Sequence, residues 1–188
     1  MNLFQLFMNS MLTENIVLTK LLGICPFIGT SKKESGALGM GISVLIVMIL
    51  SSIITYLIYH YVLVPTDTTY LRTLMFILVI SSMVQMLEII IKNRFKKLND
   101  LLGLYLPLIA TNCAVFGTTL LNIDYEFNFV EMLVFTVGSG LGFAIVIYIF
   151  STIRERFETA SIPKYFKGTP IALITASIMA LVFSRYFG

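Results

Sequence analysis

The chain has 188 residues, of which 57% are hydrophobic and only 12% are charged. An average soluble domain has about twice that charged fraction, so there are too few polar residues here to cover the surface of a water-soluble globule. The composition also excludes a disordered chain and a nucleic-acid-binding module, so no nucleic-acid partner is expected. It predicts an all-α integral membrane protein forming a single membrane domain over residues 1–188, with room for about six spans.

The apolar segments predict six transmembrane helices in chain order. The first runs roughly from Phe4 to Ile24, is interrupted by Glu14 and Lys20, and is followed by irregular backbone. The second contains no formal charge and is long enough to span a bilayer with some tilt. The second to sixth spans are Leu38–Val64, Thr73–Leu87 (extended by 88–91), Leu101–Ile123, Met132–Ile153 and Gly168–Ser184.

Basic residues alternate between the connections of these spans. The connections after spans one, three and five hold ten of them: Lys32, Lys33, Lys92, Arg94, Lys96, Lys97, Arg154, Arg156, Lys164 and Lys167. The opposite side holds only Arg72 and Arg185. Because cytoplasmic loops are enriched in Lys and Arg, this asymmetry predicts that both termini lie on the non-cytoplasmic side.

A short motif occurs twice in the chain. Residues 19–31 read TKLLGICPFIGTS and residues 107–119 read PLIATNCAVFGTT, so Cys-x-x-x-Gly-Thr-(Ser/Thr) recurs at an offset of 88 residues. Each copy lies in the first span of a three-span half, with repeat 1 at about 1–94 and repeat 2 at about 95–188. Because three is odd, the halves enter the membrane in opposite senses, as inverted repeats do.

Glycine and proline interrupt both copies of the motif, which predicts broken first helices in the two halves. Backbone groups freed by a break cannot face lipid, so each break must be buried in protein or line a cavity. Two-fold symmetry would bring Cys25 and Cys113 toward each other near the membrane centre.

Three roles remain open for these two cysteines. They can act as small buried hydrophobes, they can form a disulfide, or they can bind a metal or an iron–sulfur cluster. A [2Fe–2S] cluster takes four thiolates as a rule, and this chain has two cysteines. A cluster would therefore need two further ligands from a second chain.

Four segments in order carry a resemblance to a known family. They are ENIVLTKLLGICPFIGTSKK (14–33), LPLIATNCAVFG (106–117), IRERFE (153–158) and FKGTPIALITA (166–176). They resemble the A-type subunits of the Rnf complex family and, less closely, the E subunit of the sodium-pumping NADH:quinone oxidoreductase. Pro-Phe-Ile-Gly after Cys25 and Phe-Lys-Gly-Thr-Pro at 166–170 favour the Rnf type.

The resemblance implies a subunit of an ion-transporting translocase that passes electrons from reduced ferredoxin to NAD, coupled to export of Na⁺ or H⁺. The subunit has no catalytic residue of its own. The resemblance also implies an intramembrane [2Fe–2S] cluster that takes two cysteines from each of two chains. In this chain the cofactor-binding and metal ligands would be Cys25 and Cys113. The partner is a homologous six-helix subunit of opposite orientation, the E type. Further subunits of B, C, D and G types complete the complex in a bacterial or archaeal plasma (inner) membrane.

Other groups near the motifs suggest supporting roles. Amides freed by Gly29 and Gly117, and the hydroxyls of Thr30 and Thr118, are predicted to donate hydrogen bonds to the cysteine sulfurs.

Three charges lie nearest the hydrocarbon, namely Glu14, Lys20 and Glu88. Two interpretations apply to each of them. In the first, the charge takes part in an ion path or in coupling; in the second, it forms a buried ion pair or extends from a helix end toward the interface. The second interpretation is favoured for Lys20 and Glu88, and the two are balanced for Glu14.

Gly138, Gly140 and Gly142 have the spacing of a dinucleotide loop, but they lie inside an apolar span, which favours close helix packing. Two functions of other classes remain as alternatives to electron transfer. One is a secondary transporter with its site at the broken helices. The other is an assembly scaffold in which both cysteines are dispensable.

Overall fold

The computed structural model describes residues 2–30, 34–65, 69–94, 112–159, 163 and 166–187. These residues form helices joined by turns, with no strand among them, which confirms the all-α prediction for this part of the chain. The elements are α1 (Leu3–Met8), the π-helix η1 (Asn9–Thr13), α2 (Ile24–Thr30), α3 (Glu34–Ile58), the π-helix η2 (Tyr59–Leu63), the 3₁₀-helix η3 (Thr69–Leu71), α4 (Arg72–Arg94), α7 (Cys113–Asp124), α8 (Phe129–Thr159) and α9 (Thr169–Phe187).

Two helical stretches are long and apolar enough to cross a membrane. They are Gly36–Leu63 and Phe129–Phe157. Shorter apolar helices occupy Arg72–Met86, Cys113–Asp124 and Thr169–Arg185. Length and composition therefore agree with a membrane protein.

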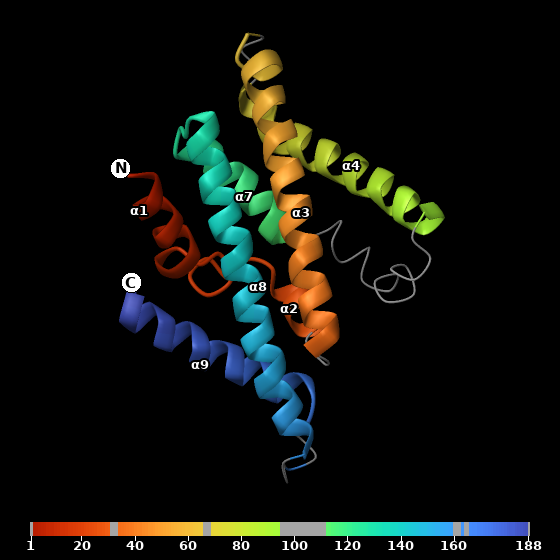
Figure 1. Ribbon diagram of the computed structural model, residues 1–188, viewed down its shortest axis with the longest axis vertical. Helices are drawn as coiled ribbons and strands as arrows, with labels where there is room; N and C mark the ends of the chain where they lie inside the picture. The colour runs from red at the N-terminus through yellow and green to blue at the C-terminus, as the bar shows by residue number, and fades with distance from the viewer. Residues whose placement is uncertain are drawn as a thin grey trace.

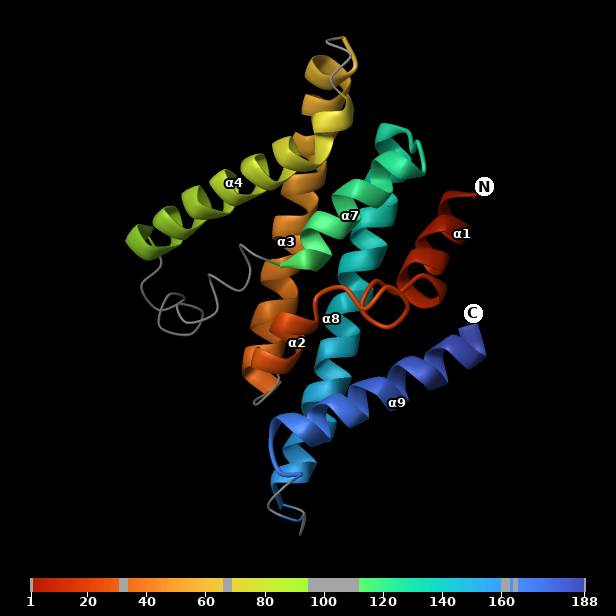
Figure 2. The ribbon, with the colours of Figure 1, turned by 180° about the vertical axis from the view of Figure 1, so that it is seen from behind.

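Helices α3 and α8 form the centre of the fold and make the most extensive contact between any two elements (Figure 1). Their backbones approach closely because small residues line the crossing: a Cβ added to Gly41 would lie 2.9 Å from Ala144 Cβ. Helix α7 packs on α3, and α1 with η1 packs on α8. Helices α4 and α9 diverge from opposite ends of this central pair (Figures 1 and 2).

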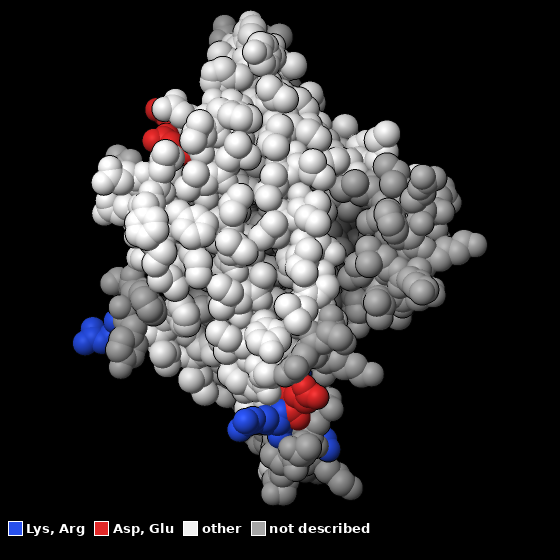
Figure 3. Space-filling view, viewed as in Figure 1, with Lys and Arg blue, Asp and Glu red and all other residues white. Residues whose placement is uncertain are grey.

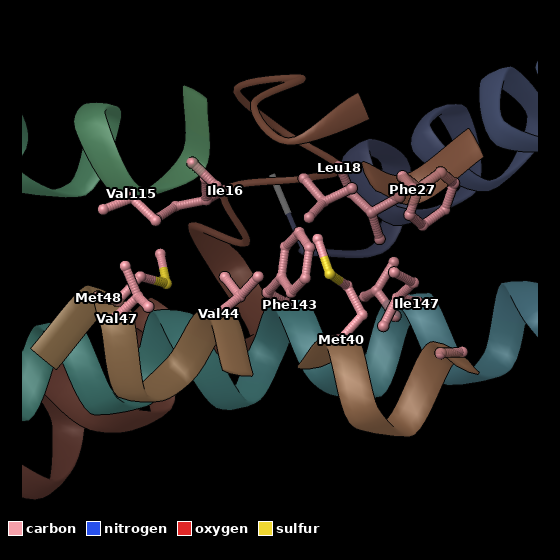
Figure 4. Close-up of a cluster of buried hydrophobic side chains, with 14 of the residues drawn as sticks. Ile16, Leu18, Phe27, Met40, Val44, Val47, Met48, Val115, Phe143 and Ile147 are labelled. Atoms are coloured by element: carbon pink, nitrogen blue, oxygen red, sulfur yellow. The ribbon is translucent and has the colours of Figure 1, made fainter. Parts of the chain in front are cut away.

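The segment between η1 and α2 supplies part of the core although it is not helical. Ile16 and Leu18 are buried there and point toward Val44 of α3 and Phe143 of α8 (Figure 4). Apolar side chains thus hold this irregular segment in place against the central pair, so its conformation is set by burial.

The surface is strongly apolar. Large exposed side chains lie on α1, α3, α4, α8 and α9, among them Phe4, Leu74, Leu78, Met86, Ile178 and Leu181. On the face drawn in Figure 3, the charged residues of the described part lie toward the ends and edges, with an uncharged area between them. An apolar surface of this extent is expected to meet lipid or another protein.

The prediction for the first span was wrong in one respect. It placed one helix over Phe4–Ile24 with irregular backbone after it, whereas helix ends at Thr13 and resumes at Ile24. Pro26 is compatible with the helix that resumes, because it is the third residue of α2, and the first turn of a helix has amide groups without intrahelical partners. Proline here lies at the start of a helix.

The described helices coincide in position with the other predicted spans, although only α3 with η2 and α8 are long and apolar enough to cross a membrane. Helix α3 with η2 covers most of 38–64, α4 covers 73–87, α8 covers 132–153, and α9 covers 169–184. Of the predicted span Leu101–Ile123, residues 101–111 lie outside the described residues, and α7 begins at Cys113.

Candidate functional site

The break before Cys25 is built by Asn15 and two residues with positive φ. Asn15 is 2% exposed; its Oδ1 accepts a hydrogen bond from the Val17 amide at 3.1 Å, and its Nδ2 donates to the Met11 carbonyl at 3.2 Å. Leu21 has a φ of 55° and Gly23 a φ of 86°. The Asn15 side chain thus bonds backbone groups that the end of the helix leaves unpaired.

Gly23 is required at its position for two reasons. Its φ lies in the left-handed region, which strains any residue with a Cβ. A Cβ there would also lie 2.9 Å from Phe143 Cε2 and 3.1 Å from Ala114 Cβ. The chain therefore passes in close contact with both α8 and α7 immediately before α2 begins.

This close approach brings the two motif copies together. The Gly23 amide donates a hydrogen bond of 2.9 Å to Cys113 Sγ. Cys25 lies two residues after Gly23, in the first turn of α2, and Cys113 is the first residue of α7. Figure 2 shows the starts of α2 and α7 in the middle of the molecule. Segments about 90 residues apart in sequence thus meet at one place.

Asn112 fixes the start of α7. Its Oδ1 accepts from the Ala114 amide at 3.0 Å, as an N-cap residue does. The residue is 3% exposed, and its Nδ2 has no hydrogen-bond partner among the described residues. An unpaired buried donor therefore lies on the residue preceding Cys113.

The two thiols differ in access but both are free. Cys25 is exposed and Cys113 is half-buried. The structure therefore does not support the disulfide interpretation. Within the described ranges, no three His, Cys, Asp or Glu side chains gather as a metal site would require. Any site built on these thiols needs further ligands from outside this part of the chain.

The donor observed at Cys113 Sγ, the Gly23 amide, is none of the four predicted donors to sulfur. The Thr118 hydroxyl donates to the Ala114 carbonyl at 2.6 Å within its own helix. Gly29 and Gly117 lie inside α2 and α7, and Gly117 instead gives space to Leu22, whose Cδ1 would lie 2.4 Å from an added Cβ. The side chain of Thr30 lies outside the described residues.

Sequence reasoning missed Gly23 as the donor and Asn15 as a residue that shapes the segment before α2, and it did not assign Asn112 as the N-cap of α7. A signal was present for Asn112, because an asparagine directly before an apolar helix is typical of an N-cap. The contact from Gly23 to Cys113 has no sequence signal, because it depends on how distant segments pack.

The structure describes the surroundings of two of the three charged side chains that were predicted nearest the hydrocarbon. Glu14 is half-buried and accepts a long hydrogen bond of 3.4 Å from the Tyr125 hydroxyl. Lys20 is exposed, and the side chain of Glu88 lies outside the described residues. Burial raises the pKa of Tyr125, and the negative charge of Glu14 raises it further.

The glycines of α8 pack closely, as predicted. A Cβ on Gly138 would lie 2.0 Å from Ser10 Oγ, and one on Gly142 would lie 2.8 Å from the Met11 carbonyl oxygen. Gly140 faces Leu45 of α3 at 3.2 Å. The three glycines thus let η1 and α3 approach α8.

A cleft of about 470 Å³ lies elsewhere, at the end of the bundle where η2 and α7 end. Its lining includes Tyr56, His60 and the ion pair Arg72–Asp124, whose nitrogen and oxygen are 2.8 Å apart. Neither cysteine is among the described residues that line it. The motif cysteines are therefore outside this cleft.

The chain matches, over residues 3–187, the family described as "Rnf-Nqr subunit, membrane protein". The chain belongs to the Rnf-Nqr family. This Rnf-Nqr chain is 47% identical over 188 residues to the A subunit of the Na(+)-translocating ferredoxin:NAD(+) oxidoreductase complex of Acetobacterium woodii, covering 100% of this chain and 98% of the relative.

Two further relatives of the Rnf-Nqr chain are each described as the A subunit of an ion-translocating oxidoreductase complex. One, from Serratia proteamaculans, is 46% identical over 183 residues, which are 97% of this chain and 95% of the relative. The other, from Photorhabdus laumondii, is 45% identical over 185 residues, which are 98% of this chain and 96% of the relative. The resemblance of the four sequence segments to the Rnf A subunits is thereby confirmed.

Proposed function

We propose that this chain is the A-type membrane subunit of an ion-translocating ferredoxin:NAD oxidoreductase, and that Cys25 and Cys113 supply half of the ligands of a [2Fe–2S] cluster. A homologous six-helix partner of opposite orientation, the E type, supplies the other half. B-, C-, D- and G-type subunits complete the complex. The names of the relatives support membership of such a complex.

The topology belongs to the same proposal. The chain crosses the plasma membrane of a bacterium or archaeon six times, as two inverted three-helix halves, with both termini outside the cytoplasm. The distribution of Lys and Arg supports this orientation. The irregular backbone before α2 and the N-cap before α7 support a broken first helix in each half.

One observation carries the cluster proposal: the hydrogen bond from the Gly23 amide to Cys113 Sγ. It joins the segment that carries Cys25 to the residue Cys113 itself, so both thiols belong to one region. Iron–sulfur clusters are held by thiolates, and hydrogen bonds to their sulfurs tune the potential. The residues present therefore fit the group as half of its ligand set.

The accessibility of the thiols also fits a shared site. Cys25 is exposed at the surface of this chain and Cys113 is half-buried. A surface position allows a second chain to approach Cys25, whereas a fully enclosed pair would not. The exposed apolar side chain of Leu21, 57% exposed, lies close in sequence to Cys25 and would be covered by such a partner.

The chain's own residues account for the local chemistry. The Gly23 amide stabilises negative charge on the sulfur of Cys113. Asn112 holds the start of α7 and presents a further amide donor, Nδ2, that has no partner among the described residues. When bound, a [2Fe–2S] cluster supplies a one-electron relay partway across about 30 Å of hydrocarbon.

The test of this proposal uses the intact complex purified with Cys25→Ala or Cys113→Ala. We expect either substitution to remove one [2Fe–2S] signal from the EPR spectrum and to leave the signals of clusters in other subunits. Ser177→Ala is the matched control, because Ser177 is exposed on α9 and its hydroxyl bonds the Leu173 carbonyl of its own helix. An unchanged spectrum in both cysteine variants would show that these thiols bind no cluster, as a transporter or a scaffold predicts.

A separate experiment tests the orientation. A reporter that is active only outside the cytoplasm, such as alkaline phosphatase, is fused after the C-terminal residue. We expect phosphatase activity in intact cells and no fluorescence from a matched GFP fusion. The opposite pattern would favour an E-type orientation over the A type.

A further inference from the structure

Helix α2, which carries Cys25, is held by two side chains of α8. The rings of Phe27 and Phe150 stack with centroids 4.1 Å apart and an interplanar angle of 24°. Four residues later on α8, the Arg154 guanidinium donates a hydrogen bond to the Ile28 carbonyl. Residues four apart share one face of a helix, so Phe150 and Arg154 together form a clamp on α2.

The clamp is buried. Phe27 and Phe150 are each 1% exposed, and Arg154 is 8% exposed. A buried guanidinium is costly unless it is hydrogen-bonded, and the bond to the Ile28 carbonyl meets part of that requirement. Helix α2 has only seven residues, and a helix this short is not stable without tertiary contacts. The position of Cys25 therefore depends on α8.

The acceptor of the Arg154 bond is a carbonyl that α2 cannot pair by itself. The last four carbonyls of a helix have no intrahelical partner, and Ile28 lies within the last turn of α2. Arg154 thus bonds a carbonyl in the last turn of α2 and places a positive charge near the negative end of the helix.

We propose that Arg154 is a positioning residue for Cys25 and that its charge raises the reduction potential of the cluster; this rests on the proposed function. Cys25 precedes Ile28 by three residues, a rise of about 4.5 Å along a helix. Fixing the end of so short a helix therefore fixes its first turn. A buried cation bonded to this helix also favours the more negative, reduced state of a cluster held by Cys25, because charges interact strongly where water is excluded.

The experiment compares Arg154→Gln with Arg154→Lys in the intact complex, by iron content and by EPR-monitored redox titration. We expect Arg154→Gln to lower the number of clusters per complex and to shift the midpoint potential of the remaining clusters to more negative values. Arg154→Lys keeps the charge, so we expect the potential to stay near that of the wild type while cluster content falls. Arg156→Gln is the control, because Arg156 is exposed on the same helix.

Phe150→Leu separates placement from charge. It removes the ring stack with Phe27 and leaves the guanidinium, so we expect lower cluster content at an unchanged potential. If Arg154→Gln gives no assembled complex, the inference is tested with Phe150→Leu and Arg154→Lys. A wild-type number of clusters per complex in both of these variants overturns the inference. Wild-type content and potential in an assembled Arg154→Gln complex also overturn it.

The two proposals fail in different ways. If Cys25→Ala leaves every cluster signal in place, the proposed function is wrong. If the cluster depends on Cys25 but is indifferent to the clamp variants, only the role of Arg154 is wrong.

Discussion

Replacing Gly23 with alanine tests whether the close approach at the break holds the site together. The substitution adds one methyl group to a residue with a φ of 86°. That methyl would lie 2.9 Å from Phe143 Cε2 and 3.1 Å from Ala114 Cβ, both closer than ordinary contact distance. The segment has to move away from α7 and α8, and the Gly23 amide moves with it from Cys113 Sγ.

The expected cost has two parts. A side chain in the left-handed region costs about 1–2 kcal/mol. Overpacking of a dense interior costs a further ~1–3 kcal/mol. Gly168→Ala isolates the first part, because Gly168 has a φ of +100° and an added Cβ would meet nothing within 4 Å. The difference between the two variants therefore measures the overlap at Gly23.

The assay is the thermal midpoint of the purified complex, followed by size-exclusion after heating, together with the redox titration. A protein of 150–250 residues loses about 2–4 °C per kcal/mol, so we expect Gly23→Ala to melt about 2–12 °C below Gly168→Ala. We also expect a more negative cluster potential in Gly23→Ala alone, since a donor to sulfur is displaced. Equal midpoints and equal potentials in the two variants would refute the close-approach explanation.

Three further predictions concern packing, a buried polar contact and titration. Gly138→Ala should destabilise the complex because its Cβ would lie 2.0 Å from Ser10 Oγ, and adding Ser10→Gly should restore part of the lost thermal midpoint, since the contact with the Phe7 carbonyl at 3.0 Å remains. Asn122→Ala should cost about 2–3 kcal/mol, since Asn122 donates to two buried hydroxyls, at 3.2 and 3.1 Å, and its removal leaves a cavity. Asn122→Leu should cost less in the same melting assay, because it keeps the volume and removes an unpaired oxygen. Burial and Glu14 raise the pKa of Tyr125 above 10.0, so the Glu14→Gln variant should titrate Tyr125 at lower pH in ultraviolet difference spectra.

Each of these three predictions has a control variant or an outcome that would contradict it. The Ser10→Gly variant alone is the reference, because it removes the hydrogen bond from Ser10 to the Phe7 carbonyl and places a glycine in a helix. A double variant no better than Gly138→Ala would contradict the overlap. If Asn122→Leu is as unstable as Asn122→Ala, the hydrogen bonds outweigh the volume. Spectra of Tyr125→Phe identify the Tyr125 signal among the nine tyrosines. The pKa of Tyr125 is raised in the folded state, so Tyr125 contributes fully to the free energy of unfolding below pH 10.0. This contribution is lost as the pH rises from 10.0 through the raised pKa of the folded state.

The sequence by itself determined the class of protein and most helix positions. Long uncharged stretches can only be buried in lipid or protein, so α3 with η2, and α8, were predictable from composition alone. The repeated cysteine motif and the family resemblance singled out Cys25 and Cys113 without any coordinates. The close packing of Gly138 was predictable too, because small residues inside an apolar span allow helices to approach.

Only the tertiary structure decided what surrounds the two thiols. Pro26 is compatible with a helix break or with a first turn, and burial of Ile16 and Leu18 against the central helices favours the second. The Gly23 amide reaches Cys113 because α7 and α8 pack against it, and Arg154 reaches α2 because α8 passes beside it. Contacts between residues about 90 and 126 positions apart depend on packing, and local sequence patterns do not encode packing.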